Sequence, residues 1–440
     1  MKGCLVGPEK KCMTHQSDSV SSRFFDPIQT LLPECPHLRQ CPTLSDERWI
    51  ELGVSRVIEA PESGRGFLQN LVSQGQRSPS YTHFFETLKS KRRLNLCDDL
   101  NDRVIEEKTR SLNDALSGFK ELNGFDVRAG DGHWHSAASH DPVRFSSLKD
   151  DGTTVSRKYP VGHLYTLDLR THLMRHLITA DQENRRKEHD MRGLKRAGAE
   201  GLRKGIAKGR KLLMVWDSAA IDFGYWQKLK QGHGIYFLCR DKEVEKIRCG
   251  DRQWDRSAAI NEGIVADRQV GSSTNSGYLV RVIEFRDPAI GKNHRFITNE
   301  MTLAPGLLAH LYRMRWDIEK VFDEVKNRLN QKKAWATSAN AKSMQGHFIA
   351  LAHNLMLLLS ERLKKEEGIE DLEEQKRRKQ RRAKEEQSGA TRRFANELAS
   401  WLLRATQRGV KFIRWLRAQL RNPPSWKAAC TALSTLYARL

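Results

Sequence analysis

The segment LYRMRWDIEKVFDEVK, residues 311–326, carries the most informative pattern in the chain. Tyr312, Arg315, Glu319 and Lys326 recur in it at relative positions 0, 3, 7 and 14. At about 100° per residue in an α-helix, these four side chains leave one narrow stripe. A neighbouring sector is apolar and comprises Leu308, Leu311, Ile318, Phe322 and Val325. The spacing therefore predicts a helix that buries its apolar sector against a sheet and holds the polar stripe at the edge of the core.

The polar stripe combines groups that can act together on a phosphodiester. A carboxylate such as Glu319 can bind a divalent cation. Arg315, Lys326 and the Tyr312 hydroxyl can bind phosphate oxygens of the same substrate. A solvated, charged helix face is the alternative explanation, so the rest of the chain has to decide between the two.

Composition narrows the choice of partner. The chain has 440 residues, of which 30% are charged, and a formal net charge of +22. The length predicts about two to four domains, and the charge predicts a polyanionic partner, with nucleic acid as the first candidate. The eight cysteines form no Cys-x-x-Cys pair and no apolar leader follows the first two residues, which indicates a reducing cytoplasm.

Two further acids follow predicted strands. Phe125, Val127 and Ala129 alternate with polar residues toward Asp131, and the apolar run 211–216 predicts a strand buried on both faces that ends at Asp217. Runs 164–170 and 174–179 predict an antiparallel hairpin between them, and shorter strand-like runs are 235–239, 278–285 and 295–297. Together with Glu319, the acids occur in the order strand, strand, helix.

Three convergent carboxylates suit a pair of divalent cations about 3.5 to 4 Å apart, which can activate a water or a 3′-hydroxyl in an in-line phosphodiester displacement. Alternatives stay open at each position. Asp217 could instead be a turn or N-cap residue, and Asp168 and Asp222 are rival acids. The histidines His133, His135 and His140 could form a zinc or transition-metal site, but no neighbouring carboxylate or cysteine completes one.

The remaining segments suggest a division of the chain. We expect a mainly helical region over 1–120, with helices at 46–59 and 81–93, as a candidate for DNA binding. The core would occupy 121–240 and 304–362, with helices at 185–210 and 223–230 and a β-rich insertion over 241–303.

The apolar stretch 348–359 predicts a buried helix too short to span a bilayer. Residues 363–440 contain the charged run 366–387 and a basic amphipathic helix over 391–421, for DNA contact or dimerisation.

These motifs resemble a known family. The pattern Tyr-x2-Arg-x3-Glu-x6-Lys matches the YREK signature of DDE transposases of the insertion-sequence-4 type in all four letters. The segments AGDG (129–132), LLMVWDSA (212–219) and RWDIEKVFDEVKNRL (315–329) are also similar to that family's segments around its three acids. The resemblance covers about residues 121–360.

The resemblance implies an α/β fold with an RNase H-like core, a mixed five-stranded sheet with helices, interrupted by a β-rich insertion before the last catalytic helix. Asp131, Asp217 and Glu319 would be the catalytic acids and the ligands of two Mg²⁺ or Mn²⁺ ions. Tyr312, Arg315 and Lys326 would hold DNA, and Trp254 is the candidate to stack on a flipped base. His133 departs from the family, because many relatives have Thr or Ser after Asp-Gly.

The function implied is a DNA transposase that acts as a homodimer on terminal inverted repeats and target DNA, in a bacterial cytoplasm near the nucleoid. Water would attack the phosphodiester at the element end, and the freed 3′-hydroxyl would attack a second strand. A catalytically silent DNA-binding protein derived from such an element is the first alternative. A nuclease with the same core but no strand transfer is the second, because one site can use either nucleophile.

Overall fold

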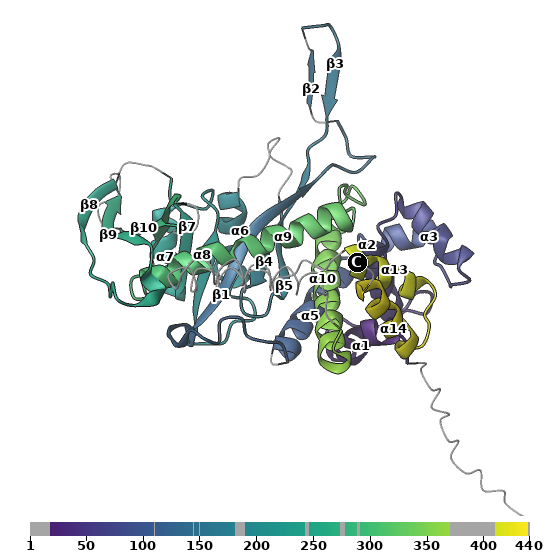
Figure 1. The fold of residues 1–440 in the computed structure, drawn as a ribbon. Helices are drawn as coiled ribbons and strands as arrows, with labels where there is room; N and C mark the ends of the chain where they lie inside the picture. The colour runs from purple at the N-terminus through teal and green to yellow at the C-terminus, as the bar shows by residue number, and fades with distance from the viewer. Residues whose placement is uncertain are drawn as a thin grey trace, which may run out of the picture.

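The protein is a mixed α/β molecule with a long sheet at one end and a body of helices at the other (Figure 1). The structure, a computed structural model, describes residues 18–109, 111–143, 145–148, 150–180, 190–242, 246–272, 278–287, 291–369 and 410–438. Most of the charged run 366–387 and residues 391–409 of the helix predicted over 391–421 lie outside these residues.

Five strands form the central part of the sheet, in the order β5-β4-β1-β6-β7. Their bounds are Phe125–His135 (β1), Val161–Asp168 (β4), Met174–Thr179 (β5), Lys211–Trp216 (β6) and Ile235–Arg240 (β7). Strands β5, β4 and β1 are antiparallel to one another, whereas β6 pairs parallel with both β1 and β7. The predicted mixed α/β fold is confirmed, and this arrangement is consistent with an RNase H-like core.

The insertion continues the same sheet instead of forming a separate layer. Its strands are β8 (Lys246–Asp251), β9 (Ile264–Ser272), β10 (Leu279–Arg286) and β11 (Asn293–Thr298). Because β11 pairs antiparallel with β7, the five expected strands become nine, with β8 at the far edge. A buried ion pair between Arg281 and Asp267, 2.5 Å between Nη2 and Oδ2, joins β10 to β9.

Helices cover both faces of the central strands, as the alternation of side chains requires. Val127, Ala129, Leu213 and Val215 belong to a core that includes α8 (Pro305–Met314), α9 (Trp316–Asp323) and α10 (Ala339–Glu367). The alternate residues of β6, such as Met214 and Trp216, pack with α6 (Asp190–Arg203) and α7 (Phe223–His233). The strand 211–216 is therefore buried on both faces, as its continuous apolar run predicts.

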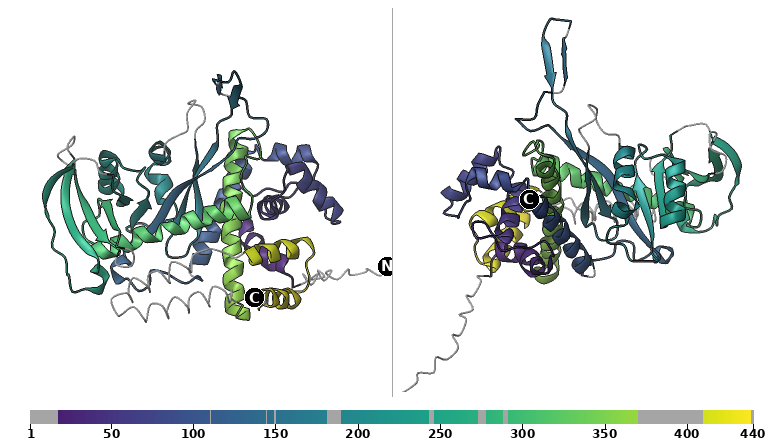
Figure 2. Two further views of the ribbon diagram at one scale, coloured as in Figure 1. Left: turned by 45° about the horizontal axis from the view of Figure 1, so that its top comes forward. Right: turned by 180° about the vertical axis from the view of Figure 1, so that it is seen from behind.

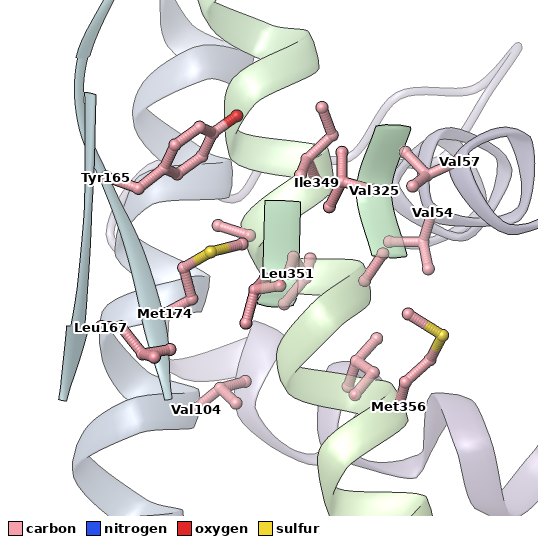
Figure 3. Close-up of a cluster of buried hydrophobic side chains, with 14 of the residues drawn as sticks. Val54, Val57, Val104, Tyr165, Leu167, Met174, Val325, Ile349, Leu351 and Met356 are labelled. Atoms are coloured by element: carbon pink, nitrogen blue, oxygen red, sulfur yellow. The ribbon is translucent and has the colours of Figure 1, made fainter. Parts of the chain in front are cut away.

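The terminal regions pack together around α10 to form the helical body (Figure 2). Its other helices are α1 (Val20–Leu31), α2 (Asp46–Glu59), α3 (Gly64–Ser73), α4 (Tyr81–Thr87), α5 (Lys91–Thr109), α13 (Val410–Arg421) and α14 (Trp426–Ala438), with short 3₁₀ turns at Leu32–Glu34 (η1) and Lys120–Leu122 (η2). The Trp426 N–H donates to the Asp18 carbonyl at 2.7 Å, so the two ends of the described chain are joined. Figure 3 shows how Met174, Ile349 and Val54, from distant parts of the sequence, pack into one core.

Three elements differ from the sequence-based expectation. The helix predicted over 81–93 is divided, because the Ser90 hydroxyl accepts the Arg93 N–H at 3.3 Å and so caps a new helix, α5. The buried helix predicted over 348–359 extends over Ala339–Glu367, from a Ser338 cap to Gly368 in the left-handed region. The hairpin β2 (Phe145–Leu148) and β3 (Thr154–Arg157) was not expected, and it projects from the body (Figure 1).

No helix among the described residues combines the length and the hydropathy needed to cross a bilayer.

Candidate active site

Asp131 and Asp217 are held at the same level of two neighbouring parallel strands. The register pairs Phe125 with Lys211 and Ala129 with Val215. Continuing this register by two residues on each chain brings Asp131 level with Asp217. Both acids share the face of Ala129 and Val215, which is the face that α8, α9 and α10 cover.

Gly130 explains why a glycine precedes the first acid. Its backbone lies under the Trp216 ring, and a Cβ atom at residue 130 would lie 1.6 Å from Cζ3 of that ring. The missing side chain lets the indole pack flat on the opposite face of the sheet from Asp131. The residue before Asp131 therefore has to be a glycine for the Trp216 ring to pack there.

Each aspartate has one oxygen fixed by the backbone. The Gly132 N–H donates to Oδ1 of Asp131, and the Ala219 N–H donates to Oδ1 of Asp217, both at 2.7 Å. The turn role that the sequence left open for Asp217 is thus present, and it leaves Oδ2 available for another role. The rival acids Asp168 and Asp222 hold turns and caps: Asp168 accepts two backbone N–H groups, and Asp222 caps α7.

Glu319, on α9, is linked to Asp131 by the Arg315 side chain, which lies near both carboxylates. The Arg315 guanidinium is only 5% exposed; its Nη2 lies 2.7 Å from Oε1 of Glu319 and its Nη1 lies 3.7 Å from Oδ2 of Asp131. One cation therefore lies between two of the three acids. In the described structure Nη1 and Nε of Arg315 are buried without a hydrogen-bond partner, so this guanidinium has donors that the neighbouring protein groups do not use.

Electrostatics also link the acids. The pKa of Asp131 is raised to about 7, mainly by burial; the negative charges of Asp217 and Glu319 contribute to this rise, whereas the Gly132 N–H and Arg315 oppose it. The Asp131 side chain nevertheless remains 20% exposed, so it is accessible from solvent. A carboxylate with this environment gains from a bound cation.

The prediction of one continuous helix over residues 312–326 is wrong, because the segment is interrupted. It consists of α8, α9 and a π-helical turn, η4 (Glu324–Arg328). At Arg315 the chain forms i→i+3 bonds, Arg315 N–H to Tyr312 O and Ile318 N–H to Arg315 O, both 3.1 Å, which tighten the junction. Lys326 lies in η4 and is exposed, close enough to His133 to lower the pKa of that buried imidazole in addition to the effect of its burial.

Tyr312 supports the site from α8. It is buried, its ring lies 4.7 Å from that of Phe296 on β11, and the Arg315 guanidinium lies 5.5 Å from its centre. Burial raises the pKa of the Tyr312 hydroxyl. The contacts place Tyr312 where it fixes Arg315 and connects the insertion to the acid-bearing helices.

The two tryptophans of interest occupy different places. Trp254, the candidate taken from the sequence, is partly buried between β8 and η3 (Ala259–Asn261), where Arg256 lies 4.5 Å from its ring centre. Trp316, which the sequence analysis did not single out, is 56% exposed and lies one helical turn before Glu319. An apolar ring at position i−3 of the acid, next to the polar stripe, was the signal that could have found it.

The histidines beside Asp131 are structural. His133 and His135 are buried, and Nδ1 of His135 lies 3.0 Å from the Gln331 carbonyl, while His140 is exposed. Within the described residues, no three His, Cys, Asp or Glu side chains are grouped closely enough to hold a metal ion. The proposed zinc alternative at these histidines therefore gains no support.

The three acids are likewise not grouped closely enough in this structure to hold a metal ion. Their chemistry nevertheless suits a divalent cation. Carboxylate oxygens are the ligands that Mg²⁺ and Mn²⁺ prefer. Asp131 has its pKa raised by burial and by its acidic neighbours, which is the environment that a cation would relieve. A mixed sheet with two strand-borne acids and one helix-borne acid beside them defines a candidate site for phosphoryl transfer.

Comparison with known proteins supports this class. Residues 140–355, just under half of the chain, match the family model described as a transposase DDE domain, which supports a DDE transposase. The matched region includes Asp217 and Glu319 but begins after Asp131. Among solved structures, the chain is similar at 15% identity and a TM-score of 0.22 to the Drosophila P element transposase strand transfer complex, over 48% of this chain and 42% of that one. That likeness is too weak to carry an argument, and no curated protein matches the chain.

Proposed function

We propose that the protein is a DNA transposase of the insertion-sequence-4 type, which cleaves phosphodiesters at the ends of a mobile element and joins them to target DNA. One observation carries the proposal: Asp131 and Glu319, 188 residues apart in the chain, both lie beside the Arg315 guanidinium, and continuing the register of β1 and β6 brings Asp217 level with Asp131. The family match over residues 140–355 supports the same class of enzyme.

In this proposal each residue has a distinct task. Asp131, Asp217 and Glu319 would hold two Mg²⁺ or Mn²⁺ ions, which supply activation of the nucleophile and charge neutralisation at the leaving oxygen. Arg315 has unused donors beside the acids and would bind a non-bridging oxygen of the scissile phosphate. Tyr312 holds Arg315 in place, and exposed Lys326 would bind a neighbouring phosphate.

The partners follow from the same proposal. Double-stranded DNA, as terminal inverted repeats and as target, would be bound by a homodimer, and the net charge of +22 supports a polyanionic ligand. Either Trp254 or Trp316 would stack on an unpaired base near the cleavage point. Residues 1–120 and 363–440 are proposed to recognise element ends or to form the dimer.

The test is a strand-cleavage assay on a plasmid that carries the gene's own flanking DNA, with Mg²⁺. We expect cleavage and joining at defined ends by the wild type, and loss of both by at least about 100-fold in Glu319→Gln. Asp323→Asn is the matched control, because Asp323 is an exposed acid on the same helix that bonds only the Asn327 amide among the contacts seen. Its activity should stay close to that of the wild type.

Other outcomes discriminate the alternatives. Binding without cleavage in both Mg²⁺ and Mn²⁺ would favour a catalytically silent DNA-binding protein. Cleavage that never proceeds to joining, even with excess target DNA, would favour a nuclease of the same fold.

A further inference from the structure

A hollow with a basic rim lies at the base of the β2–β3 hairpin, outside the group of acids. It has a volume of about 590 Å³ and is lined by Ser136 to Ser139, Lys158, Pro160, Lys332 and Lys333. Ala138, which lines the hollow, also belongs to a small apolar cluster with Val161 and Ala334. The hollow therefore combines small side chains with three lysines.

The lysines are held there by backbone pairing. Ser136, just after the end of β1, forms a parallel bridge with Lys333; its N–H donates to the Lys332 carbonyl at 2.8 Å, and its carbonyl accepts the Ala334 N–H at 2.9 Å. Lys158 is anchored across the hairpin base by a hydrogen bond from its ammonium to the Ser139 carbonyl. The three cations thus lie on fixed backbone rather than on a free loop.

These cations lack an ion-pair partner among the described side chains. Within the residues that the structure describes, none of the three ammonium groups has a carboxylate at ion-pair distance, and the neighbouring Asp141 pairs with Lys342 at 2.8 Å. Lys332 and Lys333 are exposed. Like charges held together in this way repel one another unless an anion binds between them.

The hollow is connected to the acids by β1 itself. Ser136 follows Asp131 by five residues of extended chain, which corresponds to about 17 Å. Exposed Lys326 on η4 lies along this path, beside His133 of β1. One strand of DNA rises by about 3.4 Å per nucleotide, so the hollow is about five nucleotides from a phosphate bound at Asp131.

From this geometry we infer that the hollow binds the sugar-phosphate backbone of the DNA about five nucleotides from the scissile phosphate. The inference rests on the proposed function, because it takes DNA at the acids as given. Lys158, Lys332 and Lys333 would be positioning residues: they would contact phosphates, carry no sequence information and fix the register of the duplex over the acids.

The first test is the salt dependence of DNA affinity. The variant K158Q/K332Q/K333Q should lose slope in a plot of log affinity against log salt, measured between about 50 and 200 mM on a duplex of about three helical turns. Each phosphate contact contributes about 0.9 to the slope, so we expect a decrease of about 2 to 3. The matched control K208Q/K228Q/K292Q removes the same charge at exposed lysines elsewhere and should keep the wild-type slope.

A second measurement avoids substitutions. In the wild-type protein, lysine acetylation followed by mass spectrometry should show Lys158, Lys332 and Lys333 protected when the duplex is added, and Lys208 and Lys228 unprotected. Equal slopes in both triple variants, or acetylation of the three lysines that DNA does not change, would overturn the inference while leaving the proposed function intact. Failure of the wild type to bind any duplex would instead overturn both.

Discussion

Burial of Asp131 sets the charge balance of the proposed site. Its pKa is raised to about 7 by burial, with Asp217 and Glu319 adding to the effect, whereas the ordinary value is 3.8. Between about pH 4 and pH 7 the folded protein therefore keeps a proton on Asp131 that the unfolded chain has released. Stability must fall as pH rises through this window, because the folded state binds more protons than the unfolded state.

Replacement of Asp131 by Asn should therefore stabilise the metal-free protein at high pH. We expect Asp131→Asn to raise the free energy of unfolding at pH 8 by about 1 to 3 kcal/mol, with the gain disappearing near pH 4. Urea unfolding in the presence of a chelator would measure it. Asp323→Asn, at an exposed position on α9, controls for the general effect of removing an acid, and an equal gain at pH 4 and pH 8 would contradict the argument.

The two tryptophans allow a second residue-scale prediction. Trp316 is exposed beside Glu319, whereas Trp254 is partly buried against Arg256. Stacking on a base is worth about 1 to 3 kcal/mol, so Trp316→Ala should weaken binding of a duplex with unpaired bases at its end by about 5-fold to 100-fold, with little change in thermal stability. Fluorescence anisotropy would measure both variants. A larger loss from Trp254→Ala would assign the stacking role to the insertion instead.

At the scale of the elements, α8 links the insertion to the helix that carries Glu319. Gly306, in its first turn, lies against η3: its N–H donates to the Asn261 side chain at 3.0 Å, and a Cβ there would lie 1.7 Å from the Ile260 carbonyl oxygen. The clash is with backbone, which cannot yield as a flexible side chain can. We expect Gly306→Ala to lower the free energy of unfolding by about 2 kcal/mol or more.

The control for this prediction is a glycine with free space. Gly232 in α7 would place a Cβ with nothing within 4 Å, so Gly232→Ala should be neutral or stabilise by up to about 1 kcal/mol. Chemical unfolding of both variants would test the difference. Equal effects of the two substitutions would mean that the α8–η3 contact does not hold the insertion in place.

Which elements could be predicted depends on how local their signals are. Strands β1, β4, β5 and β6 were foreseen, because their alternation or continuous apolar runs lie within a few residues. The α8–α9 break and the π turn at η4 were not, because the pattern of residues 311–326 fits a continuous helix and packing imposes the irregularity. Strands β8 and β9 were missed, since β8 at the edge of the sheet and its neighbour β9 are rich in polar residues and leave little pattern.

The three acids are easier to propose from the sequence than the residues that surround them. Three acids in the order strand, strand, helix suffice to propose Asp131, Asp217 and Glu319 as a group. No sequence pattern indicates that Arg315 lies between two of them or that Trp316 is exposed, because both facts depend on how α9 lies on the sheet. Contacts between residues far apart in the chain, such as Trp426 with Asp18, are hidden for the same reason.

At the scale of the whole molecule, a row of buried histidines connects the sheet to the helical body. It runs from β1 through β4 and β5 to α10 and comprises His133, His135, His163, His176 and His347, with successive ring centres 4.6 to 5.2 Å apart. Nitrogens of His163 and His176 lie 3.1 Å apart, and those of His176 and His347 3.2 Å. The row therefore crosses the interface between the two halves of the molecule.

Burial holds these imidazoles neutral. It lowers the pKa of His135 and of His347 to about 4 and that of His133 to about 3, and it lowers the pKa of His163 and His176 well below the ordinary 6.5. Repulsion between neighbouring imidazoles adds to the effect for His163 and His176. Several charged groups face the α10 end of the row. Asp98, whose Oδ1 lies 3.8 Å from Nδ1 of His347, opposes the lowering of the His347 pKa. Three cations strengthen it: Lys204, Lys91 and Arg175.

Acidic pH should therefore weaken the packing between the sheet and the helical body. Below about pH 6.5 the unfolded chain binds protons on these histidines that the folded protein does not, so stability falls as pH falls, opposite to the effect of Asp131. The loss should be on the order of 1 kcal/mol per histidine at pH 5. Urea unfolding from pH 5 to pH 8 should show a smaller pH dependence in His347→Gln, by about one proton, with His233→Gln at an exposed position as the control. If wild type and His347→Gln lose stability in parallel, the buried row does not govern the acid response.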